Sequence, residues 1–503
     1  MPEKPRSFYS RLFPGEWDGY PNSAISELAD WMAWEHKGSR PRRVPGSIPS
    51  GYVYFAQIVN HDLSRDHTKL SEARNRPPEA TENWRTPRLD LEILYGEGPS
   101  VDKKLYDQNH PRGRGYLVLG NTDPWSGKKS DNDLRREDSG KDAGKPITFD
   151  ERNDSTLLIA QLQVLLIKFH NRLLDDIRSG SVAGTSEGDG FEEARRLVTW
   201  HYQWIVRNDL LPKIVMPDVL DDITMHWSRL FRPKAGDVSI PVEFSLAAFQ
   251  YGHSAVQNIY SINRHVGLCP QEHTMYLTGV GRFVRPGSTD TPVSRLPERF
   301  VVEPGRMFGW APPGRSNFSA GIDTLIASGL YKVPGELSIF FNNEVLTDTR
   351  LTLTRGENPT FKLPEATLRR AAAVGLPSGQ EACRLADVRC LPEDHLAYDR
   401  QMEVFLKKNG MLNRTPLFYY LMREAEVSGR ATPGGWPGKC LGPLGSRIVA
   451  EVILGVLNAD ADSYVHSEWQ PPLVAGQLGE FARRIDSLKK LAFYATGYKG
   501  KFV

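Results

Sequence analysis

The sequence predicts a mainly α-helical protein, built as a single large helical domain with few short strands. Three observations support this prediction. The stretch Asp150–Arg178 is apolar on nearly every side, other stretches along the chain have helical spacing, and neither an internal repeat nor a clean linker is present. A helix without a polar stripe belongs inside a large protein, and at ~1.5 Å per residue this one spans about 30 Å, roughly a domain diameter. Gln161, Gln163 and Lys168 interrupt it too often for a membrane span.

Three segments are expected along the chain. Residues 1–50 are rich in Pro, Gly and Trp and are predicted to form an arm laid over the core, with one amphipathic helix at Ser23–Trp34. The helical domain is expected over residues 51–480. Residues 481–503 are expected to form a C-terminal tail.

Composition excludes several classes of protein. Formal net charge is only +2, from 63 basic and 61 acidic residues, so there is no electrostatic case for binding nucleic acid or a membrane surface. Met1–Pro14 has no apolar core of a signal peptide, which predicts a protein kept in the cytoplasm. Four scattered cysteines favour buried or idle thiols over a disulfide framework or a zinc site, although Cys383 and Cys390 could bridge in principle.

The first helix of the domain is predicted at Tyr52–Leu63. Gln57 and His61 are four residues apart and therefore share a face, with Asn60 beside them. A histidine on an apolar helix is more often a hydrogen-bonded core residue than a ligand or a catalyst. The neighbouring amides raise the weight of the functional interpretation, and both interpretations remain open from this stretch alone.

The next stretch, Arg85–Gly96, has polar residues at alternate positions. In an extended chain Thr86, Arg88, Asp90 and Glu92 would share one side. A hydroxyl, carbonyl groups and carboxylates at that spacing suit a hard cation such as calcium. A solvated edge strand explains the same pattern.

The central stretch brings an arginine to a buried position. Arg152 lies just before the first turn of the predicted helix, flanked by polar residues. At the end of a buried helix, an arginine is either paired with a carboxylate or faces a buried ligand, and the stretch alone favours the pair.

A further helix is predicted over Pro241–Tyr260, and in it Gly252 precedes His253. Glycine costs ~1 kcal/mol in a helix interior relative to alanine. The missing side chain would let something large approach the backbone beside His253. A flat cofactor and close helix packing both explain that glycine.

The remaining elements follow from spacing and turn residues. Tyr106–Thr148 is predicted to be a long loop, and Phe191–Leu211 a helix that stops at Pro212, with His201 as a packing residue. Short strands are predicted at Thr274–Leu277 and Ser338–Phe341. Four later stretches are predicted helices: Ala366–Val374, Tyr398–Asn409, Thr415–Ser428 and Leu444–Asn458.

Taken together and in order, three stretches resemble the animal-type haem peroxidases of the peroxidase–cyclooxygenase superfamily. They are FAQIVNHDL, DERNDSTLLIAQLQVLLIKFHNRLL and EFSLAAFQYGHSAV. The family pattern is Gly-Gln-x-x-Asp-His-Asp, then Arg-x-x-Glu before a Leu-rich helix, then Arg-x-Gly-His. The resemblance covers roughly residues 50–470, and the closing GPLGSRIVAEVILGVLNADADSYV looks like bacterial members.

The resemblance implies a role for each matching residue. His61 matches the distal histidine, which moves a proton between the two peroxide oxygens as general base and then general acid. Arg152 matches the distal arginine, which stabilises charge on the breaking O–O bond. Gln57 matches the glutamine that orders water or halide, and His253 matches the proximal ligand of the haem iron.

The resemblance also implies a cation and further haem contacts. Asp62, Thr86, the carbonyl of Arg88 and Asp90 match the calcium ligands, and Glu92 stands where the family usually has Ser. Arg370 matches an arginine that contacts a haem propionate.

Five departures from the family pattern bear on how haem is held. Asn60 and Ser155 replace the two carboxylates that form ester bonds to haem in mammalian members, so non-covalent haem b is expected. Thr156 stands where one subgroup has a Met that links to haem. Gln250 replaces an arginine and is not the radical-carrying tyrosine of cyclooxygenases. Thr367 falls where an Asn accepts a hydrogen bond from the proximal histidine, which leaves that hydrogen bond in doubt.

The expected function is therefore that of a haem peroxidase, which reduces hydrogen peroxide and oxidises an organic or halide co-substrate. Its partners would be peroxide and an unidentified small-molecule reductant, and such an enzyme would serve the response to oxidative stress. One alternative is an oxygenase that acts on a fatty acid or a natural-product intermediate, since Tyr251 lies next to Gln250. The other is a non-catalytic haem-binding sensor, which would not need Gln57, His61 and Arg152 together. The oligomeric state stays open.

Overall fold

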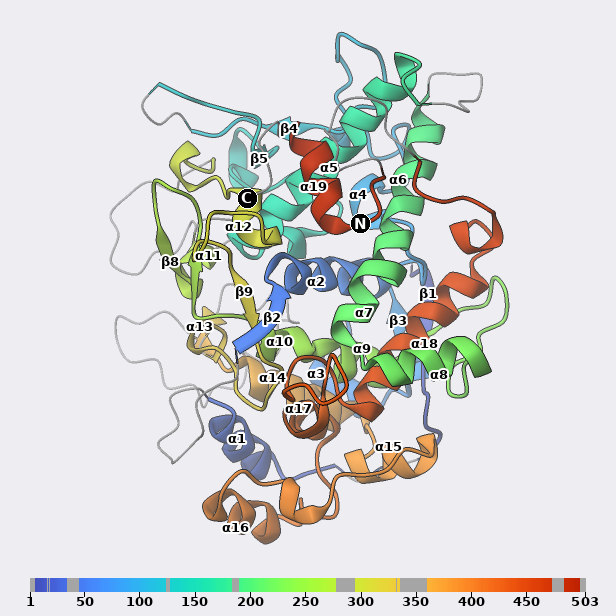
Figure 1. Ribbon diagram of the computed structural model, residues 1–503, viewed down its shortest axis with the longest axis vertical. Coiled ribbons are helices and arrows are strands. Elements are labelled where there is room, and N and C mark those ends of the chain that lie inside the picture. The colour runs from blue at the N-terminus through green and yellow to red at the C-terminus, as the bar shows by residue number, and fades with distance from the viewer. Residues whose placement is uncertain are drawn as a thin grey trace.

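Helix α5 (Leu157–Arg178) runs through the upper half of the molecule, and the other long helices pack around it or below it (Figure 1). This computed structural model describes residues 5–15, 17, 19–33, 45–123, 127–182, 190–276, 295–331, 333–334, 360–472 and 484–497. The hydroxyl of Thr156 caps α5 by accepting a hydrogen bond from the amide of Ile159. By length and composition α5 could cross a membrane, but 78% of its most apolar window is buried inside the protein. A core helix passes the same test, so the predicted buried helix is confirmed.

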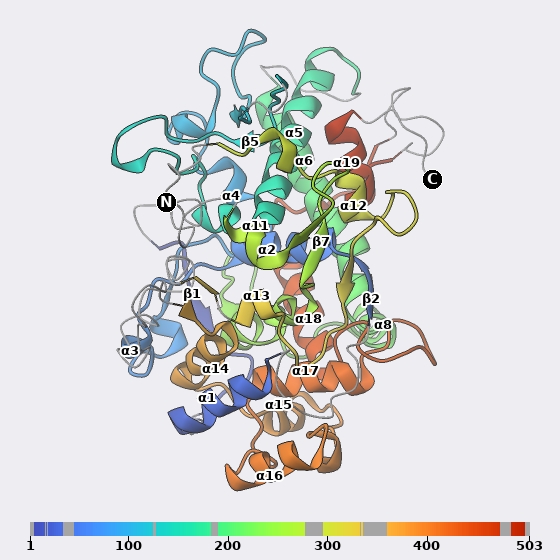
Figure 2. The same ribbon diagram turned by 90° about the vertical axis from the view of Figure 1, so that its left-hand side faces the viewer.

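Among the described elements, helices α2 (Gly51–Leu63), α6 (Phe191–Ile205) and α19 (Leu488–Thr496) pack most extensively against α5. Helix α2 crosses the middle of the molecule beneath it, and α6 and α19 lie alongside it (Figures 1 and 2). Polar residues of α2 therefore lie close to those just before α5. Helix α19, which belongs to the stretch predicted as a C-terminal tail, packs on α5 with its apolar residues buried.

The helix predicted to stop at Pro212 continues past it. Helix α6 passes through a π-helical turn, Val206–Leu210, into α7 (Leu211–Ile214). Proline has no N–H to donate to the helix ladder, and a wider π turn accommodates that irregularity. The prediction of a stop at Pro212 is therefore wrong.

The prediction of a continuous helix over Pro241–Tyr260 is also wrong. The chain forms α9 (Val242–Leu246), a 3-10 turn at Ala248–Tyr251 and α10 (Gly252–Ala255), with a break at Ala247 (φ −135°, ψ −70°). The side-chain amide of Gln250 donates to the carbonyl of Ser245 at 2.6 Å. That bond satisfies a carbonyl near the break, so the chain can change direction just before His253.

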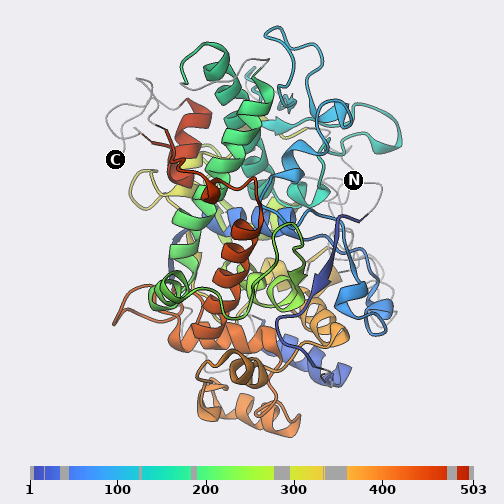
Figure 3. The same ribbon diagram turned by 90° about the vertical axis from the view of Figure 1, so that its right-hand side faces the viewer.

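The lower half is also helical (Figures 1 and 3). Helix α1 (Asn22–Trp31) packs on α14 (Leu363–Val374), and α17 (Leu417–Ser428) packs on α18 (Pro443–Ala459). These helices, together with α16 (Arg400–Lys408), confirm the five helices predicted in the arm and the last third of the chain. The remaining described helices are α3 (Leu70–Ala73), α4 (Glu92–Tyr95), α8 (Pro217–His226), α11 (Gln271–Tyr276), α12 (Pro304–Phe308), α13 (Ser328–Tyr331) and α15 (Gly379–Ala386).

The strands are few and short, as predicted. One three-stranded sheet has the order β3 (Glu82–Asn83), β1 (Ser7–Ser10), β6 (Ile240–Pro241), with β1 antiparallel to β3 and parallel to β6. This sheet fastens the N-terminal arm to the start of the α9–α10 segment. The other strands pair in twos: β2 (Pro45–Pro49) with β9 (Phe318–Ala320), β4 (Leu119–Gly120) with β5 (Asp133–Leu134), β7 (Ile259–Ser261) with β8 (Leu268–Pro270), and β10 (Val333–Pro334) with β11 (Thr360–Phe361).

Two predicted extended stretches differ from the structure. Residues Gln271–Tyr276 are helical, so the strand predicted at Thr274–Leu277 is wrong, as short apolar runs fit either structure. The chain from Arg85 to Leu91 is irregular and leads into α4, because carboxylates rather than a neighbouring strand accept its backbone N–H groups. The strand predicted at Ser338–Phe341 lies outside the described residues.

Candidate active site

A cavity lies between α2 and the α9–α10 segment, and its lining combines residues from three distant parts of the sequence. It holds about 1020 Å³ of space not filled by atoms, its open mouth included. Seven of the residues predicted for the site line it: Gln57, Asn60 and His61 from α2, Arg152 and Ser155 from the start of the central stretch, and Gln250 and His253 from the segment opposite. The structure thus places the predicted distal and proximal residues around one space.

His61 is 6% exposed and is held through one ring nitrogen. Its Nδ1 lies 2.7 Å from Oδ1 of Asn153. Burial, and then the charge of Arg152, lower the pKa of His61 to about 3. The ring is therefore neutral near pH 7 and has a lone pair with which to accept a proton.

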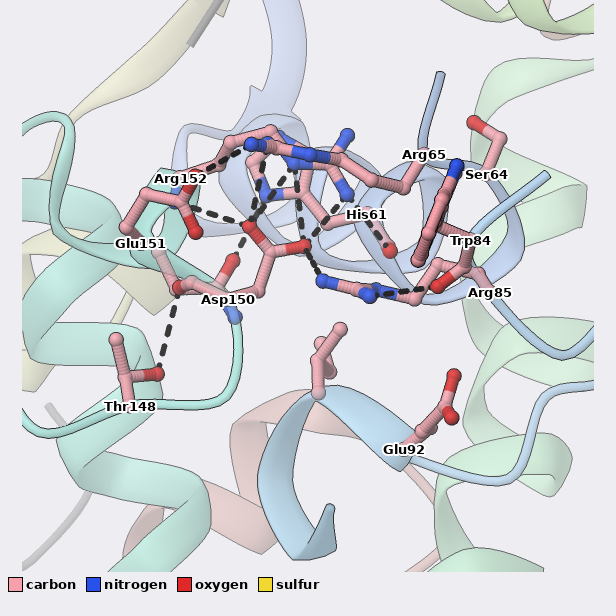
Figure 4. A network of polar contacts seen from close by, with 12 residues as sticks. His61, Ser64, Arg65, Trp84, Arg85, Glu92, Thr148, Asp150, Glu151 and Arg152 are labelled. Atoms are coloured by element: carbon pink, nitrogen blue, oxygen red, sulfur yellow. Dashed lines mark hydrogen bonds and ion pairs between the residues drawn. The ribbon is translucent and has the colours of Figure 1, made fainter. Parts of the chain in front are cut away.

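Arg152 is paired with a carboxylate, which is the interpretation that its sequence position favoured. Its guanidinium forms hydrogen bonds to the carboxylate of Asp150, with Nε 2.9 Å from Oδ1, and it donates from Nη2 to the backbone carbonyl of His61 at 3.0 Å (Figure 4). It also lines the cavity. The structural pair therefore fixes the arginine beside His61 at the cavity wall.

Asp150 is the centre of a network that the sequence did not reveal. Three arginines surround this fully buried carboxylate: Arg152, Arg85 at 2.5 Å and Arg65 at 3.7 Å (Figure 4). Burial favours the neutral acid, but the three guanidinium groups outweigh it and hold the pKa of Asp150 well below its usual range. No local pattern could have revealed this network, because Arg65 and Arg85 lie far from Asp150 in sequence and come together only on folding.

His253 lies on the opposite side of the cavity. Burial lowers the pKa of its imidazole to about 4, so the ring is neutral. Its Nδ1 is buried without a hydrogen-bond partner in the part of the chain that the structure describes. The hydroxyl of Thr367 instead donates to the carbonyl of Leu363 at 3.0 Å, one turn back in α14. Among the described residues, Thr367 therefore does not accept a hydrogen bond from His253.

Gly252 leaves open space beside His253. A Cβ added to this glycine would meet only a methyl group of Val53, at 3.9 Å, which is ordinary contact. Its backbone has no left-handed conformation that would require glycine. Close packing among the described residues therefore does not explain Gly252.

The residues that replace the family's ester-forming carboxylates face the cavity without offering a carboxylate. Asn60 and Ser155 both line it. The neighbouring Asp154 is fully buried and turned toward Arg136, whose Nη1 and Nη2 lie 2.8 Å and 3.0 Å from its oxygens. Glu151 forms an ion pair with Arg65. Both carboxylates near the start of α5 are thus already engaged elsewhere.

Arg370 does not line this cavity, in contrast to its predicted contact with a haem propionate. Its guanidinium forms an ion pair with Asp66 and donates to the carbonyl of Thr68 at 2.7 Å. Tyr251, next to Gln250, does line the cavity, and its buried hydroxyl has no hydrogen-bond partner among the described residues.

The residues predicted to hold calcium form a separate acidic cluster next to α2. Asp62 accepts from the amide of Leu91 through Oδ2 at 3.0 Å, while its buried Oδ1 has no hydrogen-bond partner within the described ranges. Thr86 donates to Asp90 at 2.9 Å, and burial and then Glu92 raise the pKa of Asp90 to about 6. The side chain of Arg88 faces Asp460 and Asp462. In the described part of the chain, no three His, Cys, Asp or Glu side chains are grouped so as to hold a metal on their own.

Known proteins resemble the chain in both sequence and fold. Residues 38–282 match the family model described as animal haem peroxidase. Over 314 residues the chain is 26% identical to thyroid peroxidase from Canis lupus familiaris, and over 134 residues it is 30% identical to chorion peroxidase from Drosophila melanogaster. These matches cover 60% and 25% of this chain but only 29% and 16% of those proteins, so the matched part is a fraction of each relative's length.

Two solved structures share the fold. Peroxidase A from Dictyostelium discoideum superposes with a TM-score of 0.57 at 14% identity, over 92% of this chain and 89% of that one. Fatty acid alpha-dioxygenase from Oryza sativa superposes with a TM-score of 0.58 at 14% identity, over 98% and 79%. The architecture is therefore the helical haem peroxidase fold. It is the fold of the peroxidase–cyclooxygenase superfamily, and residues 38–282 also match the sequence model of animal haem peroxidases.

Proposed function

We propose that this chain is a haem peroxidase, which binds haem b in the cavity between α2 and α10 and reduces hydrogen peroxide at the expense of a small reductant. The observation that carries the proposal is the lining of that cavity, with Gln57, His61 and Arg152 on one side and His253 on the other. His253 would ligate the iron, and Gly252 leaves room beside it. Haem, when bound, supplies the redox-active metal.

The chain's own residues supply proton transfer and charge stabilisation. Neutral His61 can accept the proton of the peroxide at one oxygen and return it to the other. Arg152, held in place by Asp150 and by the carbonyl of His61, presents a fixed positive charge to the developing negative charge. Gln57, one helical turn before His61, can order a water molecule by hydrogen bonding.

The experiment titrates the purified chain with haem b and then mixes the complex with hydrogen peroxide in a stopped-flow spectrometer. The wild-type protein should bind haem and change its spectrum rapidly. His253→Ala should bind haem loosely or not at all, whereas His61→Ala should keep haem and react more slowly by ~10²-fold or more. The opposite behaviour of the two variants would reverse the assignment of the two sides. A haem complex that does not react with peroxide would favour the sensor alternative.

A second cavity favours the oxygenase alternative. It holds about 1080 Å³ of unfilled space and has mostly apolar walls, including Leu158, Leu162, Met307 and Phe308. Tyr54 lines both cavities, so the two spaces are neighbours. An apolar substrate could lie there next to the site. Oxygen uptake with an apolar substrate in the absence of peroxide would support this activity, and peroxide-dependent oxidation alone would exclude it.

The acidic cluster is the proposed cation site. Asp62 follows His61 directly, and its unpartnered Oδ1, together with the oxygens of Thr86 and Asp90, suits a hard cation such as calcium. A cation bound there would fix the end of α2. Removing it with a chelator should lower the stability of the protein and disturb the haem spectrum. Metal analysis that finds no calcium in a fully active protein would remove this proposal.

A further inference from the structure

A series of hydrogen bonds leads from His61 into the core through two buried side chains and one backbone carbonyl. Oδ1 of Asn153 lies 2.7 Å from Nδ1 of His61. The amide nitrogen of Asn153 donates to Oε1 of Gln163 at 3.2 Å, and Nε2 of Gln163 donates to the backbone carbonyl of Ile93 at 3.5 Å. Asn153 and Gln163 are 0% and 2% exposed. Because both side chains are buried, water cannot supply a hydrogen bond that either of them loses.

The backbone carbonyl of Ile93, the last group in this series of hydrogen bonds, fixes the orientation of both side-chain amides. A backbone carbonyl only accepts hydrogen bonds, so the Gln163 group that faces Ile93 must be the NH2 group. The Gln163 oxygen then faces Asn153, which must donate to it from its own NH2 group. This leaves the Asn153 oxygen facing His61. The reversed arrangement would set two oxygens against each other in a buried place, at a cost of roughly 1–3 kcal/mol for each unsatisfied group.

An oxygen opposite Nδ1 decides which ring nitrogen of His61 carries the proton. Because Asn153 Oδ1 can only accept, Nδ1 must donate, and in a neutral imidazole the other nitrogen then has the lone pair. Within the described chain Nε2 of His61 has no hydrogen-bond partner, and the residue lines the cavity. The free lone pair is thus on the nitrogen that is not tied into the core.

We propose that Asn153 is a positioning residue, held in one orientation by Gln163, that locks His61 in the Nδ1–H tautomer and so offers Nε2 to the cavity as the proton acceptor. The proposal rests on the peroxidase function only for its catalytic consequence. The tautomer itself is a property of the folded chain.

The first test measures the tautomer directly. Full-length chain labelled with ¹⁵N-histidine is studied by NMR at neutral pH before haem is added, with His61→Gln to identify the signal. The wild-type protein should show protonated Nδ1 and unprotonated Nε2. Asn153→Leu should shift His61 toward the other tautomer or a mixture, and Asn153→Asp, which can still accept, should restore Nδ1–H. Gln163→Leu should give a mixture, because Asn153 can then turn over. A wild-type Nε2–H tautomer would overturn the proposal.

The matched control is Gln203→Leu, which removes another buried side-chain amide, one that donates to the carbonyl of Leu89 at 3.0 Å far from His61 in the chain. It should leave the His61 tautomer as in the wild type. If this variant shifted the tautomer as much as Gln163→Leu does, the effect would be general loosening of the core, and the proposal would fail.

The second test measures the catalytic consequence with haem and hydrogen peroxide. Asn153→Leu should slow the reaction with peroxide by at least ~10-fold, up to the ~10²-fold expected for losing acid–base help, with Asn153→Asp largely restored. An unchanged rate in Asn153→Leu would overturn the positioning role. If the wild-type protein itself failed to react, the proposed function would be wrong while the NMR result still decided the tautomer.

Discussion

At the scale of single residues, the candidate site depends on a buried carboxylate as much as on the side chains proposed to be catalytic. Asp150 has no predicted role in the reaction, yet it fixes Arg152 and is surrounded by Arg65 and Arg85. Three guanidinium groups around one carboxylate leave an excess of positive charge beside the cavity. Such a charge suits a site where negative charge develops, and it makes the aspartate difficult to replace.

Asp150→Asn should therefore destabilise the protein strongly. Removing the charge leaves the buried Arg65 and Arg85 and the largely buried Arg152 with less compensation, and breaking a buried pair costs ~3–5 kcal/mol. The pKa of Asp150 is depressed in the folded state, so its stabilisation is present above the unfolded-state value of ~3.9 and is lost as pH falls below it. Urea unfolding of both proteins should show the largest difference near neutral pH.

Asp462→Asn is the control for loss of one carboxylate. Asp462 is 87% exposed and lies 3.4 Å from Arg88, so its removal should cost less than ~1 kcal/mol. Equal effects of the two substitutions would mean that the Asp150 network adds nothing beyond a surface pair.

Single side chains at the cavity also determine how haem would be held. Asn60 and Ser155 line the cavity, and neither side chain can form an ester through a carboxylate. Asp154 and Glu151 are engaged with Arg136 and Arg65. Acidified organic solvent should therefore extract unmodified haem b, and denaturing mass spectrometry should give the mass of the bare polypeptide. A species heavier by one haem would contradict this prediction.

At the scale of elements, the N-terminal arm is fastened to the segment that carries His253. The carboxylate of Glu243, at the start of α9, accepts from the backbone amides of Leu12 and Phe13 at 3.0 Å and 3.4 Å. Strand β1 also pairs with β6, directly before α9. Anchoring the arm therefore also steadies the start of the proximal segment.

Glu243 predicts a pH dependence of stability. Burial raises its pKa from 4.5 to about 7, so between these values the folded protein keeps a proton that the unfolded chain has released. The free energy of unfolding should then fall as pH rises through this range, with a slope from this group of at most ~1.4 kcal/mol per pH unit. Thermal or urea unfolding of Glu243→Gln from pH 4.5 to 8 should lack this part of the slope.

The comparison must allow for a second buried carboxyl group, Glu424, and needs one control variant. Burial also raises the pKa of Glu424 to about 7, so Glu424 adds a slope of the same sign that should persist in Glu243→Gln. Glu79→Gln removes one exposed carboxylate and should reproduce the wild-type profile. A Glu243→Gln profile parallel to the wild type would show that this carboxylate is ionised in both states.

At the scale of the whole molecule, the C-terminal helix is part of the core rather than an appendage. Helix α19 packs on α5, and the ring of Phe493 lies 4.1 Å from the ring of Trp310 in the segment after α12. The hydroxyl of Tyr494 donates to Asp176 of α5 at 2.5 Å. The last described helix, α19, thereby covers one side of the central helix α5.

Phe493→Ala should lower the free energy of unfolding by ~3–5 kcal/mol, the usual loss for a buried aromatic side chain, in a single cooperative transition. Trp436→Ala, at a residue that is 78% exposed, should change it by less than ~0.5 kcal/mol. Calorimetry that resolves an early transition affected only by Phe493→Ala would indicate a separate C-terminal unit.

Much of the architecture could be predicted from local patterns. The all-round apolar character of Asp150–Arg178 and the helical spacing of α1, α2, α14, α16, α17 and α18 depend on side chains within a few turns, so periodicity alone reveals them. At two of the places where prediction failed, polar side chains competed with the backbone pattern expected from local spacing. Carboxylates of Asp62 and Glu92 take backbone N–H groups that a strand would need, and Gln250 bridges the break in the α9–α10 segment.

The sequence by itself determined which chemical groups are available at the site: the histidines, the distal arginine and glutamine, and the absence of the two ester-forming carboxylates. Only the tertiary structure decided how these groups face one another. It placed Arg65 and Arg85 around Asp150, put Asn153 against His61, and paired Thr367 with the carbonyl of Leu363 and Arg370 with Asp66. The physical reason is that burial makes each polar group take whichever partner the packed helices bring within hydrogen-bond distance, and no local sequence pattern encodes that distance.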